Sequence, residues 1–125
     1  MEITTFSDYQ KEATVLTISL NKFKENFPDL DDDIMKLLAV AYDGLGLGEA
    51  GEVQGKIKKI IRDNGGIITP EATDAIKDEL GDTLWYITSM CENLGITLED
   101  VAKCNIEKLY DRRARGVLGG SGDKR

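Results

Sequence analysis

The stretch TPEATDAIKDELGDTLWYITSMCENLG, residues 69–95, decides the fold class of this chain. Thr69 followed by Pro70 is typical of a helix N-terminus, because the threonine side chain caps free backbone N–H groups and proline fits the first helical position. Gly95 is typical of a helix end, since glycine readily takes the backbone conformation that closes a helix. We therefore predict one long helix that closes near residues 93–95.

The residues before this stretch predict two more helices. Ser7 and Gln10 have the spacing of a capping box, and apolar residues then recur at steps of three and four as far as Phe27. A second helix is predicted from about Asp33 to Asn64, where two glycines stop it. It contains five glycines, and each costs about 1 kcal/mol relative to alanine, which favours close approach of another helix or a ligand.

The residues after this stretch predict one more helix and a tail. Thr97 with Asp100 caps a helix that continues to about Arg115, and no convincing strand or linker is present. We predict an all-α fold, a four- to five-helix bundle in one domain over residues 1–115. A glycine-rich tail follows over residues 116–125, and it either folds over bound phosphates or is a disordered terminus.

Composition excludes several locations and functions. No apolar run approaches the roughly 20 residues of a membrane span, and the first nine residues lack a signal-peptide pattern, so we expect a cytoplasmic protein. Cys91 and Cys104 have no further Cys or His with which to form a zinc site, and we expect reduced thiols. A net charge of −7 disfavours nucleic acid as a partner.

The chain has no histidine, and this limits its possible chemistry. Histidine-based zinc hydrolysis, a Ser-His-Asp triad and the Glu-x-x-His di-iron site of helical bundles are all excluded. Any catalysis must use carboxylates, lysines, arginines, tyrosines or a metal that prefers oxygen ligands.

Two pairs of acidic residues have the spacing that such a metal needs. Glu49 and Glu52 are three residues apart on the second predicted helix, and Glu79 and Asp82 repeat that spacing on the third. A short connection makes these helices an antiparallel hairpin, so the four carboxylates can converge. Four ionised carboxylates repel one another unless a cation neutralises them, and this predicts Mg²⁺, with Mn²⁺ as the alternative.

Basic and polar residues lie where they could face a polyphosphate. We predict phosphate contacts by four residues on the second and last helices: Lys56, Asn105, Lys108 and Arg112. A second interpretation is open for all of these charges. Acidic pairs are common on solvated helix faces, and cations near helix C-termini favourably complement the helix dipole.

The two acidic segments resemble those of the MazG-like, all-α nucleoside triphosphate pyrophosphohydrolases. Residues 46–53, GLGEAGEV, resemble the family's first acidic motif and residues 78–82, DELGD, resemble the second. The family pattern is E-E-x-x-E followed by E-x-x-D, so Glu49 and Glu52 match its second and third acids, while Gly48 replaces the first. The resemblance covers residues 33–115 and includes the segment that begins at Asn105.

The resemblance implies an enzyme that cleaves a nucleoside triphosphate to the monophosphate and pyrophosphate. It implies that Glu49, Glu52, Glu79 and Asp82 hold Mg²⁺ and carry the catalysis, with a spare carboxylate accepting a proton from water. It also implies a base-binding pocket with aromatic candidates for stacking: Phe6, Tyr9, Tyr42, Trp85 and Tyr86. For each of these aromatic residues, a place in the core is the commoner role.

The third helix also predicts an oligomer. Ile76, Leu80, Leu84 and Ile87 lie on one side of it, and Trp85 lies on nearly the opposite side. One hairpin cannot cover both sides, so we expect a homodimer, or a dimer of dimers, that completes the MazG-like bundle. Two alternatives remain for the function: a helical module that binds a nucleotide or partner without hydrolysis, and a pyrophosphohydrolase for phosphoribosyl-ATP or a modified nucleotide.

Overall fold

The computed structural model describes residues 2–17 and 19–119 of the chain, and these residues are largely helical. Their elements are, in chain order, α1 (Phe6–Leu16), α2 (Ser19–Asn26), α3 (Asp32–Gly46), the short 3-10 helix η1 (Leu47–Glu49), α4 (Ala50–Asp63), α5 (Pro70–Leu94) and α6 (Leu98–Ala114). The predicted all-α class is confirmed within these residues. None of the described helices is long and apolar enough to cross a membrane.

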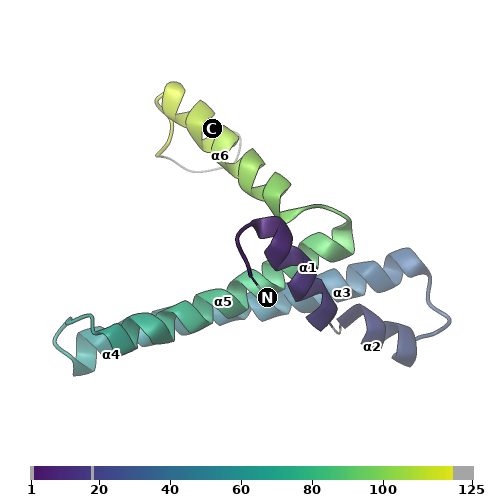
Figure 1. Cartoon of the computed structure of the whole chain (residues 1–125), viewed down its shortest axis with the longest axis horizontal. Helices are drawn as coiled ribbons and strands as arrows, with labels where there is room; N and C mark the ends of the chain where they lie inside the picture. The colour runs from purple at the N-terminus through teal and green to yellow at the C-terminus, as the bar shows by residue number, and fades with distance from the viewer. Residues whose placement is uncertain (1, 18, 120–125) are drawn as a thin grey trace.

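Helix α5 is the central element, and it begins and ends where the sequence predicts. The Thr69 side chain accepts a hydrogen bond from the Ala72 N–H, and Gly95 ends the helix with a left-handed backbone at φ 69°. The helices α1, α3 and α4 and the turn η1 all pack against α5. Figure 1 shows α4 and α5 side by side, with α3 continuing past the middle of α5.

The first predicted helix is divided into α1 and α2. Helix α1 ends at Leu16, and the Thr17 backbone is extended at φ −74° and ψ 123°. The β-branched residues Thr14, Val15 and Thr17 lower helix propensity here. The two pieces also pack on different partners, α1 on α5 and α6 and α2 on α3, so the chain changes direction between them.

The N-terminal cap of α1 lies two residues earlier than predicted. Thr5 is the N-cap and Asp8 completes the capping box, instead of Ser7 and Gln10. The Ser7 and Gln10 side chains instead form tertiary hydrogen bonds with the connection between α5 and α6 and with the first turn of α6. The Ser7 hydroxyl donates to Glu99 (2.8 Å), and Gln10 bonds the backbone of both Ile96 (3.2 Å) and Leu98 (2.8 Å).

The second predicted helix is interrupted at η1, which separates α3 from α4. A Cβ added at Gly46 would overlap the Tyr86 ring, whereas a Cβ at Gly44 or Gly48 would meet nothing within 4 Å. Gly46 therefore lets the α5 side chain lie directly against the backbone of α3. Glu49 is the last residue of the interrupting turn.

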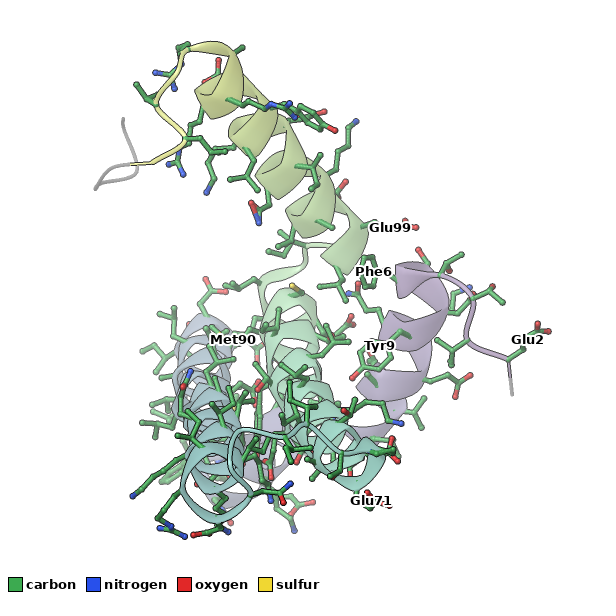
Figure 2. All side chains as sticks on the ribbon, turned by 90° about the vertical axis from the view of Figure 1, so that its left-hand side faces the viewer. Glu2, Phe6, Tyr9, Glu71, Met90 and Glu99 are labelled. Carbon is green, nitrogen blue, oxygen red and sulfur yellow. The ribbon has the colours of Figure 1, made fainter. Side chains whose placement is uncertain are left out.

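Helix α6 extends away from the other helices, as Figure 2 shows, with Phe6 and Glu99 near its junction with α1. Its N-cap Thr97 and its end at Ala114 agree with the prediction. Within the described residues α6 packs mainly on α1, so the hydrogen bonds of Ser7 and Gln10 determine its direction. The predicted phosphate-covering tail lies outside the described residues from position 120 onward.

The apolar core of the chain is small. Among the described residues, the buried apolar ones are Ala13, Met35, Ala39, Cys91 and Leu98. Large apolar side chains are exposed on several helices, among them Leu45 (81%) and Ile61 (67%). Homodimerisation, which the sequence predicts as the way to cover such surface, stays a prediction at this point.

We predict that Gly46→Ala destabilises the protein although alanine favours helix. The new methyl group meets the Tyr86 ring, and overpacking of this kind costs about 1–3 kcal/mol in the free energy of unfolding. Gly44→Ala, at an open position of the same helix, is the matched control, with an expected gain of up to about 1 kcal/mol. Urea unfolding measures both, and equal stability of the two variants would contradict the close contact.

Candidate functional site

Three of the four predicted acids converge where η1 packs on α5. One carboxylate oxygen from each of Glu49, Glu79 and Asp82 lies within 4.8 Å of the other two. Glu49 and Glu79 are partly buried, whereas Asp82 is exposed, so the group opens to solvent. Glu52 lies on the exposed surface of α4 and is not a member of the group.

Local structure explains why Glu49 is free to face α5. It is the N-cap of α4, but its side chain makes no capping hydrogen bond. Its carboxylate and that of Glu52 lie at the positive end of the α4 dipole, which stabilises negative charge by about 0.3–1 kcal/mol per group. Glu79 and Asp82 are one turn apart on α5 and therefore point to the same side.

Lys56 is the one predicted phosphate contact that lies beside the acids. Its Nζ is 3.3 Å from Oε1 of Glu79, and the two side chains are 34% and 17% exposed. The three carboxylates carry more negative charge than one lysine neutralises. An all-oxygen group with excess negative charge fits Mg²⁺ or Mn²⁺, because both ions accept carboxylate ligands and retain waters.

Two tyrosines border the acids. Burial, together with the Asp82 carboxylate, raises the pKa of Tyr9. Burial also raises the pKa of Tyr86, and the nearest carboxylates, Glu49 first, add to the effect. Both phenols therefore keep their protons at neutral pH and are available as hydrogen-bond donors.

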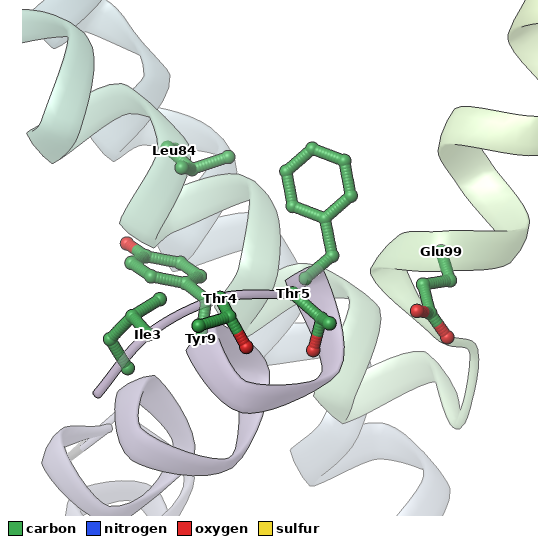
Figure 3. A pocket seen from close by; sticks show the side chains of 7 residues that line it. Ile3, Thr4, Thr5, Tyr9, Leu84 and Glu99 are labelled. Carbon is green, nitrogen blue, oxygen red and sulfur yellow. The ribbon is translucent and has the colours of Figure 1, made fainter. Parts of the chain in front are cut away.

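Tyr9 also lines two hollows between α1 and α5. The larger, of about 490 Å³, lies against Leu84 and extends toward Glu99, and Figure 3 shows Tyr9 between Ile3 and Leu84. The second, of about 280 Å³, is mostly apolar and is lined by Tyr9 and Trp85 together with Ile3, Glu12, Ala13, Val15 and Leu16. Trp85 is one turn beyond Asp82 on α5, so this hollow lies next to the acids.

The Trp85 side chain has one buried donor that is unpaired within the described part of the chain. Among the described residues, no acceptor reaches its indole Nε1, although this atom is buried. An unpaired buried N–H costs about 1–3 kcal/mol in the free energy of unfolding. The sequence contains no signal for this feature, nor for the roles of Ile3 and Glu12 in the hollow.

The other aromatic candidates lie in different surroundings. The Tyr86 ring is 5.2 Å from that of Trp85 and covers Gly46. Tyr42 packs edge-on against Phe23 of α2, with ring centroids 5.9 Å apart. Tyr42 thus belongs to the contact between α2 and α3, whereas Tyr9 shares the larger hollow with Phe6 and the smaller one with Trp85.

The remaining predicted phosphate contacts lie on α6. Asn105 and Lys108 are exposed and line a hollow of about 500 Å³ on this helix. Arg112 is buried, with 4% of its surface exposed. Because α6 extends away from α4 and α5, one chain does not gather these residues around its own three acids (Figures 1 and 2).

Comparison with known proteins identifies the family. Residues 45–117, which contain all four predicted acids, match the MazG nucleotide pyrophosphohydrolase domain. The chain is 44% identical over 94 residues to the Gene 37 protein of Mycobacterium phage L5, covering 74% of this chain and 82% of that protein. No solved structure matches. The chain therefore belongs to the MazG nucleotide pyrophosphohydrolase family.

Proposed function

We propose that this protein is a cytoplasmic, Mg²⁺-dependent pyrophosphohydrolase that cleaves ribo- or deoxyribonucleoside triphosphates to the monophosphate and pyrophosphate. The observation that carries the proposal is the convergence of Glu49, Glu79 and Asp82 from two helices. Membership of the family supports the same reaction class. Removal of unwanted nucleotides from the cellular pool is the corresponding role.

The residues around the acids have distinct tasks in this proposal. Glu49, Glu79 and Asp82 would hold Mg²⁺, which supplies positive charge to the phosphate oxygens when bound. Lys56 offsets the negative charge that develops on the phosphates. Glu52, one turn after Glu49 and outside the group, is the spare carboxylate that accepts a proton from the attacking water.

The hollow between Tyr9 and Trp85 is the proposed base site. Its apolar lining, which includes the rings of Tyr9 and Trp85, suits the faces of a nucleobase. Trp85, on the lining of this hollow, is one turn from Asp82 on α5, so the base would lie beside the phosphates. Tyr86, packed on Gly46, supports Trp85 from the side.

We predict that Glu49→Gln and Asp82→Asn each lower kcat by about 100-fold or more, because each removes a charge from the group that binds the metal. Pyrophosphate release from a panel of canonical and modified triphosphates measures this. Asp78→Asn, an exposed acid beside Glu79 but outside the group, is the matched control and should leave kcat within about twofold. No release from any nucleotide by the folded, Mg²⁺-supplied protein would favour a non-catalytic binding module.

We predict that Trp85→Phe raises KM for the preferred nucleotide by about threefold with little change in kcat, since the smaller ring covers less of the base. An aromatic ring is retained and an unpaired buried donor is lost, so the free energy of unfolding should stay equal or increase. Steady-state kinetics and urea unfolding measure the two effects. An unchanged KM for every nucleotide would place the base elsewhere.

We further propose that the protein is a homodimer. The chain exposes 9010 Å² of surface, whereas a compact monomer of its mass, 13.8 kDa, exposes about 6,600 Å². The excess, roughly 2,400 Å² per chain, is within the range that each subunit buries in an obligate dimer. Much of the exposed surface is apolar, including Leu37, Leu45 and Leu80 on α3 and α5 and Ile106 on α6.

In this homodimer α6 would serve the partner's site. The described structure holds α6 away from its own acids through Ser7 and Gln10, yet Asn105 and Lys108 remain exposed on it. A second copy that packs along α6 would receive these residues near its acids. The acids and the α6 residues of one site would then come from different subunits.

Co-purified heterodimers test this arrangement. One subunit carries Asp82→Asn and the other Lys108→Ala, each with its own affinity tag. If α6 acts on the partner, one of the two sites keeps both its acids and its lysine, so the heterodimer should show about half of the wild-type activity. If each chain serves itself, both sites are defective and activity stays at the level of the single variants. A protein that sediments as a monomer would contradict the homodimer.

A further inference from the structure

A buried carboxylate that the proposed function does not use lies where α3 crosses α5. Asp43 is 3% exposed and accepts two hydrogen bonds on the same oxygen, Oδ2. The donors are the Ser89 hydroxyl at 2.6 Å and the Asn93 amide at 3.1 Å, and both residues are themselves buried. A carboxylate is costly to bury, so a role for it is expected.

These hydrogen bonds restrict how the two helices can slide. Apolar side chains such as Met35 and Ala39 tolerate a small shift, because dispersion contacts have no preferred direction. A hydrogen bond weakens steeply with distance and angle, and a buried donor or acceptor left unpaired costs about 1–3 kcal/mol. Asp43 therefore favours one register of α3 against α5.

The same alignment of the two segments brings the acidic residues together. Along the two antiparallel helices, Asp43 meets Ser89 and Asn93, Gly46 meets Tyr86, and Glu49 meets Asp82 and Glu79. Each step is about one helical turn from the previous one. The buried hydrogen bonds and the carboxylates thus lie on one continuous contact between the two segments.

We propose that Asp43, through Ser89 and Asn93, is a positioning residue that sets the register at which Glu49 faces Glu79 and Asp82. The inference rests on the proposed function, because it assigns these acids to the metal. A shift of one residue moves a helix by about 1.5 Å, whereas Mg²⁺ requires its oxygens at about 2.0–2.1 Å. A register error of that size removes at least one carboxylate from the ion.

A cysteine pair reports the register without metal or nucleotide. The substitutions Gly46→Cys and Tyr86→Cys place two thiols where Gly46 meets Tyr86, one turn after Asp43 and one turn before Glu49. The exposed Cys104 is replaced by serine in this chain, so that it does not compete for disulfide formation. We expect disulfide formation to slow by about 10-fold when Asp43→Ala or Ser89→Ala is added, because the thiols no longer meet in one alignment.

Thr88→Val is the matched control. Thr88 is adjacent to Ser89 and 1% exposed, but its hydroxyl donates to the Leu84 carbonyl of its own helix, at 2.8 Å. Its replacement removes a buried hydrogen bond without affecting α3, so the disulfide rate should be unchanged. Asp43→Asn keeps an oxygen that can accept both bonds and should restore the rate to within about threefold of the unsubstituted chain. Equal rates in the Ser89→Ala and Thr88→Val chains would overturn the proposal.

The affinity for Mn²⁺ extends the test to the acids. In the chain without introduced cysteines, Asp43→Ala and Ser89→Ala should weaken Mn²⁺ binding by about 10-fold, and Thr88→Val should not. Unchanged Mn²⁺ affinity in these two variants would also overturn the positioning role. If the wild-type protein binds Mn²⁺ and cleaves no nucleotide, the proposed function fails while the disulfide rates still decide the register.

Discussion

Everything at this site depends on holding three carboxylates together against their mutual repulsion. Glu49, Glu79 and Asp82 have oxygens within 4.8 Å of one another, with Lys56 as a nearby cation. Like charges at this distance disfavour one another unless a cation joins them, so helix packing must supply the constraint. The packing of α3, η1 and α4 on α5 does so, with the Tyr86 ring on Gly46 as its closest contact.

Helix α5 carries two acids of the charged group and the tryptophan of the apolar hollow, because residues three positions apart lie on neighbouring parts of its surface. Glu79 and Asp82 point toward η1 and α4, while Trp85, one turn later, lines the hollow with Tyr9 of α1. Residues three or four positions apart lie on one side of a helix, so acids and aromatic residues are necessarily neighbours. The helix thereby places a charged group that suits phosphates beside an apolar hollow that suits a base.

The chain alone leaves much apolar surface uncovered. Its buried apolar residues are few, while α3, α5 and α6 expose large aliphatic side chains. Hydrogen bonds from Ser7 and Gln10 hold the start of α6 against α1, so contacts within the chain set the direction of α6. The proposed second copy would cover this exposed surface and would bring Lys108 to acids other than those of its own chain.

Sequence by itself determined the all-helical class, the ends of α5 and α6, and the family, because caps, glycines and the spacing of acids are local signals. It also determined that Glu79 and Asp82 share a face. Only the tertiary structure decided that the first helix divides after Leu16, that η1 interrupts the second, and that Glu52 stands outside the group. These features depend on contacts between distant residues, such as Tyr86 on Gly46 and Ser89 on Asp43, which local propensity does not encode.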